Sequence, residues 1–285
     1  MLRSNSAYSR LMKAGEREFT QFVNTLSSQF DTLPLIPKPS LPFTVLILSP
    51  HPDDECIISS LPLRLMHENN AHIINVAVTL GSNLKRKKAR SKELQNACAY
   101  LEMELDILSE EWPVKAKELK SLIQKYQPNL IVAPHVNDFH PTHVKTGKLL
   151  EKVLKSLKFN TLIAWSEFWG RVDKPNCLVE VPNEILELQI QALVMHEGEV
   201  ARNPYHLRLP AWMMDNVRRG GEIISNVGGE VPTMPFGVIY QLQLLKNGKL
   251  TNPKLPTPFL TSLADLGQIF NEILEAASGS KTKVK

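Results

Sequence analysis

The chain has 285 residues, 43% of them hydrophobic and 22% charged, which is an ordinary globular composition with room for one large domain or two small ones. A formal net charge of +4 is too small for a protein devoted to nucleic acid, so no nucleic-acid partner is expected. The three cysteines, Cys56, Cys98 and Cys177, do not form the pattern of a disulfide framework. The sequence shows no signal peptide and no run long enough to span a membrane, and we therefore expect a cytoplasmic protein.

Residues 1–42 are expected to form an N-terminal helix and a linker. Apolar side chains at helical spacing predict an amphipathic helix over residues 7–30, and the stretch 33–42 is too rich in proline for a helix or a central strand. A single α/β domain is expected over residues 43–277. Residues 278–285 are expected to be a disordered tail.

Apolar runs alternate with helical patterns from residue 44 onward. Strands are predicted at residues 44–49, 73–80, 105–108, 130–133 and 161–165, and helices at 57–67, 86–104, 114–126 and 144–157. After these come a strand at 178–181, a helix at 183–196, a loop-rich segment at 200–235, a strand at 236–245 and a helix at 263–277. Because the early strands are apolar on both faces, we predict a Rossmann-like α/β fold whose mainly parallel sheet is covered by helices on both sides.

The first polar motif follows the strand at 44–49 and reads His51-Pro52-Asp53-Asp54-Glu55. Proline suits the first turn of a helix, and the helix dipole keeps carboxylates in that turn ionised. An ionised carboxylate is what a metal ligand and a general base both require. The alternative is that the acids only satisfy the start of the helix, with His51 as a polar cap.

The second polar motif, His140-Pro141-Thr142-His143, follows the strand at 130–134 and repeats the layout of strand, short loop, His-Pro and helix. Ligands of parallel α/β sheets bind beyond the carboxyl ends of the strands, where both motifs fall, so the motifs could meet in space. Three protein ligands with an open fourth position form the typical catalytic zinc site. The two motifs together predict a metal site that catalyses hydrolysis.

These residues resemble the LmbE/PIG-L family of zinc-dependent deacetylases, which act on N-acetylglucosamine units. The family hallmark of His-Pro-Asp-Asp-Glu is complete in residues 51–55, and its partner Asp-x-His-Pro-Asp-His is matched by Asp138 to His143, with Thr142 in place of an aspartate. A further family feature is similar to Arg90-Ser91-Lys92-Glu93-Leu94. The resemblance covers roughly residues 44–170 well and the remainder loosely.

The resemblance implies a role for each motif residue. The implied zinc ligands are His51, Asp54 and His143, and Fe²⁺ is the alternative metal. Asp53 is implied as the general base for an attacking water, with His140 as the partner that faces the substrate carbonyl.

Three more residues complete the expected site. The resemblance implies that Arg90 contacts substrate hydroxyls. Since Thr142 cannot supply the family's charge, Asp138 is expected to orient His140 and to raise its pKa. His135, at the end of the strand 130–133, is a candidate substrate-binding residue, with a hydrogen-bonded structural role as its alternative.

We therefore expect a zinc-dependent hydrolase that removes the acetyl group from an N-acetylglucosamine-type small molecule or glycoconjugate. One alternative is a metal-dependent hydratase on the same scaffold. Another is a non-catalytic protein that binds an anion through the basic run over residues 85–92, which could equally hold an anionic group of the substrate. The sequence is compatible with a homo-oligomer.

Overall fold

A computed structural model of the chain describes residues 17, 21, 35–167, 169–225 and 232–279. The predicted N-terminal helix over residues 7–30 lies outside the described residues, except at positions 17 and 21. The predicted tail also lies outside them beyond residue 279. None of the helices in the described part of the chain is both long and apolar enough to cross a bilayer.

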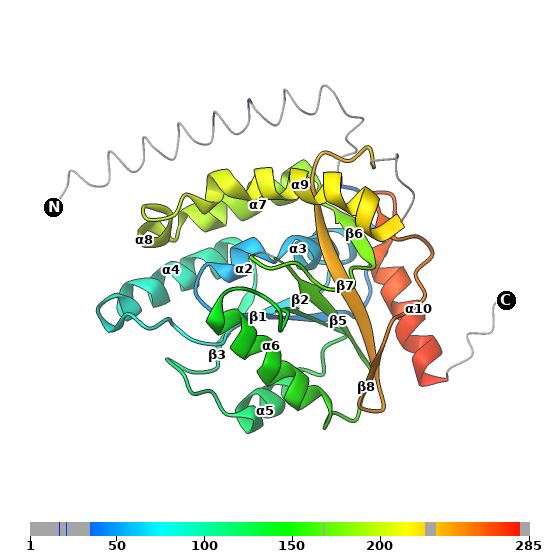
Figure 1. Cartoon of the computed structure of the whole chain (residues 1–285), viewed down its shortest axis with the longest axis horizontal. Helices are drawn as coiled ribbons and strands as arrows, with labels where there is room; N and C mark the ends of the chain where they lie inside the picture. Colours follow the sequence, from blue (N-terminus) through cyan, green and yellow to red (C-terminus); the bar gives the residue numbers. More distant parts are fainter. Residues whose placement is uncertain (1–16, 18–20, 22–34, 168, 226–231, 280–285) are drawn as a thin grey trace.

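The described residues form one sheet with helices on both sides (Figure 1). Its strands are β1 (Thr44–Ser49), β2 (His72–Ala77), β3 (Glu104–Ile107), β4 (Leu130–Pro134), β5 (Thr161–Ser166), β6 (Cys177–Glu180), β7 (Gly237–Lys246), β8 (Lys249–Thr251) and β9 (Phe259–Leu260). The helices are α2 (Asp54–Ile57), α3 (Ser60–Asn69), the 3-10 turn η1 (Leu84–Arg86), α4 (Lys87–Tyr100), α5 (Ala116–Tyr126), α6 (Pro141–Leu154), α7 (Asn183–Val194), α8 (Glu197–Val200), α9 (Tyr205–Ser225) and α10 (Leu266–Ser278).

The sheet order is β3-β2-β1-β4-β5-β7-β6-β9, with β8 paired to β7. The first five strands along the chain, β1 to β5, are parallel to one another, whereas β7 runs antiparallel to both β5 and β6. The strand order reverses between β1 and β4, which are hydrogen-bonded neighbours. Parallel α/β sheets bind ligands at such a switch point, and the two polar motifs follow these two strands. The predicted fold class is confirmed, with an antiparallel extension beyond β5.

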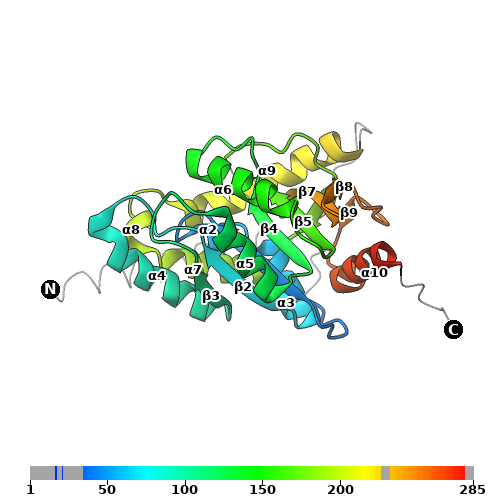
Figure 2. The same cartoon turned by 90° about the horizontal axis from the view of Figure 1, so that it is seen from below.

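Alternate residues of β1 face two separate cores, which explains the continuous apolar run of this strand. Val45 and Ile47 pack with residues of α3, α4, α7 and α10 on one face. Leu46 and Leu48 pack with residues of α5 and α6 on the other face (Figure 2). The sheet is therefore buried on both sides, and the site can open only at its strand ends.

The segment over residues 200–235 was predicted to be loop-rich, and that prediction is wrong. It contains α9, a helix of 21 residues that packs against β6, β7 and α7. Leu209, Met213 and Val217 follow one another at four-residue spacing and are buried. Pro210 lies inside this helix and hides the pattern, because proline usually ends a helix.

Candidate active site

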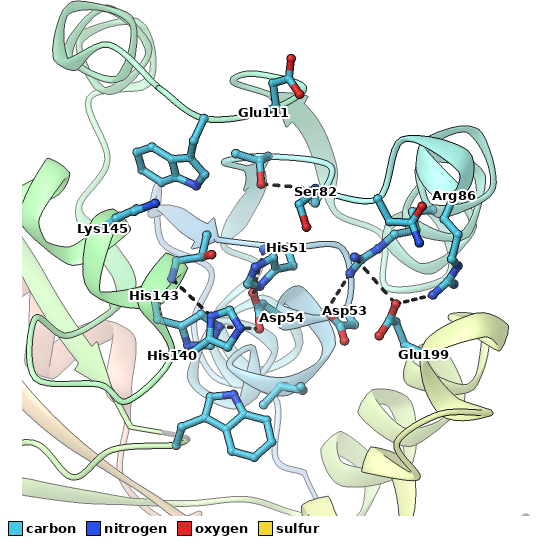
Figure 3. Close-up of a pocket in the computed structure, with 18 of the residues that line it drawn as sticks. His51, Asp53, Asp54, Ser82, Arg86, Glu111, His140, His143, Lys145 and Glu199 are labelled. Atoms are coloured by element: carbon cyan, nitrogen blue, oxygen red, sulfur yellow. Dashed lines mark hydrogen bonds and ion pairs between the residues drawn. The ribbon is translucent and has the colours of Figure 1, made fainter.

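A cavity of about 480 Å³ opens at the carboxyl ends of β1, β2 and β4. Its walls come from the segments that follow these strands, together with the region between α8 and α9. Figure 3 shows three imidazoles and Asp54 gathered on one side of the cavity, and Arg86 and Glu199 on the other. The predicted convergence of the two polar motifs is therefore present in the fold.

The side chain of Asp54 lies between two histidines from different motifs. Its Oδ2 is 3.3 Å from Nδ1 of His51, and its Oδ1 is 3.4 Å from Nε2 of His143. The nitrogen ligand atoms of His51, His140 and His143 all lie within 4.8 Å of one another. Two ligand atoms at about 2.0–2.2 Å from one zinc ion are at most about 4.4 Å apart. Both contacts of Asp54 lie within this limit, so His51, Asp54 and His143 are candidate ligands of one divalent cation.

Local folding fixes each of these ligands. Asp54 lies in the first turn of α2, and its Oδ2 accepts a hydrogen bond of 2.8 Å from the backbone N–H of His51. Helix α6 begins at Pro141, with His140 as its N-cap. A Cβ atom at Gly147 would lie 2.9 Å from the carbonyl oxygen of Pro134, so only glycine lets α6 approach β4 this closely. That approach places His143 over the end of β1.

The carboxylates around His143 set its charge in the metal-free protein. Burial alone would lower the pKa of His143, but Asp54 and Asp138 outweigh it and raise that pKa to about 10. Burial would likewise raise the pKa of Asp54, but His143 and His51 outweigh it and lower that pKa below its ordinary value. A cation bound by these groups replaces the proton on His143.

Asp138 lies beside two histidines, the expected His140 and also His143. Its Oδ1 accepts a hydrogen bond of 2.7 Å from the backbone N–H of His140, and its Oδ2 is 3.6 Å from Nδ1 of His143. Asp138 therefore holds the backbone of His140 and also lies beside the ring of His143. Its carboxylate favours a higher pKa for His140, but burial and the rings of His51 and His143 outweigh that effect. A carboxylate behind a ligating histidine is a recurrent feature of zinc sites.

His140 is held as a neutral imidazole with a defined donor. Burial and the rings of His51 and His143 lower its pKa below the ordinary value. Its Nδ1 accepts a hydrogen bond of 3.3 Å from the backbone N–H of Thr142. With Nδ1 as the acceptor, the ring proton belongs on Nε2.

Asp53 is buried and has an unusual backbone conformation. Its φ of 120° is rare for a residue with a side chain and costs about 1–3 kcal/mol. Burial raises the pKa of Asp53 well above its ordinary value, the Asp54 carboxylate adds to this rise, and the Arg90 guanidinium opposes it. Strain and a raised pKa together at a cavity wall are typical of a functional group.

Both arginines of the basic run over residues 85–92 are engaged within the protein, whereas Lys85, Lys88 and Lys92 are exposed. Arg90 lies 3.7 Å from Asp53 and 3.7 Å from Glu199, and donates a hydrogen bond of 2.9 Å to the carbonyl oxygen of Pro52. Arg86 contacts Glu199 at 2.6 Å. Arg90 thus lines the cavity where a substrate contact was expected, and its own contacts hold the Pro52–Asp53 segment. These pairings weaken the case for a protein that binds anions through this run alone.

His135 lies outside the cavity. Its Nε2 is 2.9 Å from the carbonyl oxygen of Gly170, and its Nδ1 accepts from the backbone N–H of Asn137. Both ring nitrogens therefore hold loops together, which supports the structural role and not the substrate-binding one.

Several residues of the cavity wall were not predicted from the sequence. Trp112, Trp169 and Tyr205 contribute aromatic surface, and Glu199 contributes a buried carboxylate. Burial would raise the pKa of Glu199, but Arg90, Arg202 and Arg86 outweigh it and lower that pKa. Only tertiary folding brings these residues to the site, and no local motif marked them.

A second group of potential ligands, Glu55, Cys56 and His196, lies beneath the cavity and is fully buried. Oε1 of Glu55 and Nε2 of His196 are 2.6 Å apart, which is a hydrogen-bond distance and too short for two neighbouring ligands of one zinc ion. Burial also raises the pKa of the Cys56 thiol, so a thiolate ligand is disfavoured. The group is therefore a hydrogen-bonded pair with a thiol beside it.

Comparison with solved structures shows the same fold in several enzymes. The chain resembles N,N'-diacetylchitobiose deacetylase from Pyrococcus horikoshii at 19% identity and a TM-score of 0.55, over 70% of this chain and 83% of the other. It resembles the 4-carboxy-2-hydroxymuconate hydratase GalB from Pseudomonas putida at 12% identity and a TM-score of 0.56, over 70% and 95%. A deacetylase of teicoplanin biosynthesis matches at 15% identity and a TM-score of 0.53, over 74% and 100%.

A family match agrees with the motifs and with the fold. Residues 46–154 match the family described as PIG-L: GlcNAc-PI de-N-acetylase. The match includes His51, Asp54 and His143, and so contains both halves of the candidate metal site. The chain therefore carries a PIG-L (LmbE-like) family domain, and the resemblance in its sequence is confirmed.

Proposed function

We propose that the protein is a zinc-dependent N-deacetylase that acts on an N-acetylated amino sugar, as a small molecule or as part of a glycoconjugate. The observation that carries the proposal is the convergence of His51, Asp54 and His143 within reach of one ion, with Asp53 beside them. The PIG-L match and the deacetylases among the similar structures support the reaction class.

Different residues of the cavity have different roles in the proposed amide hydrolysis. Zinc held by His51, Asp54 and His143 would polarise the substrate carbonyl and lower the pKa of a water molecule toward about 7. Asp53 accepts the proton of the attacking water, for which a pKa raised toward the working pH is suitable. The Nε2–H of His140 would donate a hydrogen bond to the substrate carbonyl oxygen as negative charge develops on it. As the C–N bond breaks, the proton that Asp53 took from water passes to the leaving nitrogen, so the products are acetate and a free amine.

The walls of the cavity fit a sugar with polar substituents. Trp112 and Trp169 offer flat aromatic surfaces at the cavity wall, and Lys145 and Arg202 offer donors there. An aromatic ring can pack against the C–H face of a sugar while the donors meet its hydroxyls or an anionic substituent. Fe²⁺ remains the alternative metal for two imidazoles and one carboxylate.

The test is acetate release from a panel of N-acetylated sugars by the zinc-loaded protein. Asp53→Asn should lower kcat by about 10²–10⁴-fold, because the amide cannot accept the proton. Glu111→Gln is the matched control, since Glu111 is an exposed carboxylate of the cavity wall with no contact to the histidines. It should retain kcat.

Two results would reject the deacetylase. One is full turnover by the Asp53→Asn variant. The other is hydration of an unsaturated acid by a protein that releases no acetate, which would favour the hydratase on the same scaffold.

A further inference from the structure

The peptide group between Pro52 and Asp53 is held at both of its polar ends. Nη2 of Arg90 donates a hydrogen bond of 2.9 Å to the carbonyl oxygen of Pro52. The N–H of Asp53 donates a hydrogen bond of 2.9 Å to Oε2 of Glu55. The orientation of this peptide sets the φ of 120° at Asp53, and so the direction of its side chain.

The two residues that hold this peptide, Arg90 and Glu55, both contact one short segment far along the chain. Nε2 of His196 lies 2.6 Å from Oε1 of Glu55, and Oε1 of Glu199 lies 3.7 Å from Nη1 of Arg90. His196 is the N-cap residue of α8, and Glu199 lies within that helix. Both residues are buried, at 0% and 1% exposure, so solvent cannot replace either contact.

The two oxygens of Glu55 have separate partners. Oε2 accepts from the backbone of Asp53, and Oε1 accepts from the ring of His196. Removal of the imidazole donor leaves Oε1 with only the weak donor Sγ of Cys56 at 3.5 Å. The carboxylate is then free to rotate away from the Asp53 N–H, and the strained backbone is free to relax.

We propose that residues 196–199 act as a clamp that orients Asp53, with His196 as a positioning residue for the general base. The inference rests on the proposed function, because it concerns the base of that reaction. His196 does not line the cavity and touches no reacting atom, so it acts only through Glu55 and the Pro52–Asp53 peptide.

Three variants of the full-length, zinc-loaded protein separate this role from simple packing. His196→Met has a side chain of similar length without the donor, and His196→Gln keeps an N–H donor near the position of Nε2. Gln189→Met is the matched control. Gln189 is also buried and donates to the carbonyl oxygens of Cys56 and Ile57, but it does not touch the Pro52–Asp53 peptide.

His196→Met should lower kcat on the order of 100-fold while KM and zinc content stay within about twofold of wild type, because the base is misplaced and substrate binding is not. His196→Gln should recover most of the loss, and Gln189→Met should keep the wild-type kcat even if its melting temperature falls. A His196→Met protein with wild-type kcat, or an equal loss of kcat in Gln189→Met, would overturn the clamp.

Hydrogen exchange at the Asp53 amide gives a readout that needs neither turnover nor a folded variant. In the wild-type protein this amide should exchange as slowly as those of β1, because Glu55 accepts its hydrogen bond. Rapid exchange there would reject the clamp by itself. A wild type that releases no acetate from any sugar but protects this amide would reject the proposed function and leave the clamp standing.

Discussion

His143 and Asp54 are placed so that a proton and a metal ion compete for one position. Asp54 and Asp138 raise the pKa of His143 to about 10, so in the metal-free protein the ring keeps its proton at neutral pH. A ligating imidazole must be neutral, and binding therefore expels that proton. The same carboxylates that attract the cation also stabilise the histidine when the cation is absent.

The pKa of His143 predicts the pH dependence of metal binding. Zinc binding at pH 7.5 should release at least one proton, and the apparent affinity should rise about tenfold per pH unit for each proton released as the pH increases toward 10. Calorimetry in two buffers of different ionisation enthalpy counts the protons. Asp138→Asn should reduce the release, since it removes one of the two carboxylates beside the ring. Binding without proton release would contradict the assignment of His143 as a ligand.

The motif residues that belong to the site could be predicted from the sequence, but the side chains that they contact could not. The strand pattern predicted that the two polar motifs could meet, because their strands end at the same edge of a parallel sheet, and the family resemblance implied His51, Asp54 and His143 as the ligands. The contacts of Asp138 and the position of His135 away from the cavity depend on the path of the loop at 135–140. Side-chain direction in such a loop follows from its backbone turns, which no periodic pattern encodes.

At the scale of whole elements, regular strands were found where the sequence predicted them. The predicted strand at 44–49 coincides with β1, since a strand buried on both faces has a continuous apolar signal. The switch between β1 and β4 required knowledge of strand order, which the pattern of a single strand does not contain. Helix α9 was missed because Pro210 interrupts its pattern, while its stability comes from packing on β6, β7 and α7.

Arg64 on α3 ties the helical layer to the far edge of the sheet. Its Nε donates to Glu68 at 2.6 Å, and its Nη1 donates to the carbonyl oxygens of Glu180 at 3.0 Å and Leu260 at 3.2 Å. These carbonyls belong to β6 and β9, and the Arg64 side chain is completely buried. Replacement of this guanidinium therefore removes contacts among three elements at once.

Arg64→Met should lower the free energy of unfolding by about 3–5 kcal/mol, because it leaves the Glu68 carboxylate buried without its partner. The double variant Arg64→Met, Glu68→Leu should recover part of this loss. Urea denaturation measures both values. Arg218→Met, which removes an exposed ion pair with Asp215, is the control and should cost at most about 1 kcal/mol. A loss of that small size for Arg64→Met would show that Arg64 does not hold the layers together.

In the whole molecule, the sheet brings segments that are distant in the sequence together at the cavity. His51 and Asp54 follow β1, His143 follows β4, and residues 196–199 come from the start of α8, between β6 and β7 in the chain. Each segment reaches the cavity because its strand or helix is fixed by the two cores on either side of the sheet. The candidate site is therefore a product of topology, and not of any one segment.

If His51, Asp54 and His143 hold one catalytic zinc ion, anomalous diffraction at the zinc edge from crystals of the zinc-loaded protein will locate it. We predict one ion at about 2.0–2.2 Å from a nitrogen of each histidine and an oxygen of Asp54, with Asp53 outside the ligand sphere. An ion bound elsewhere, or a well-ordered cavity that takes up no metal from zinc-containing buffer, would rule out this zinc site.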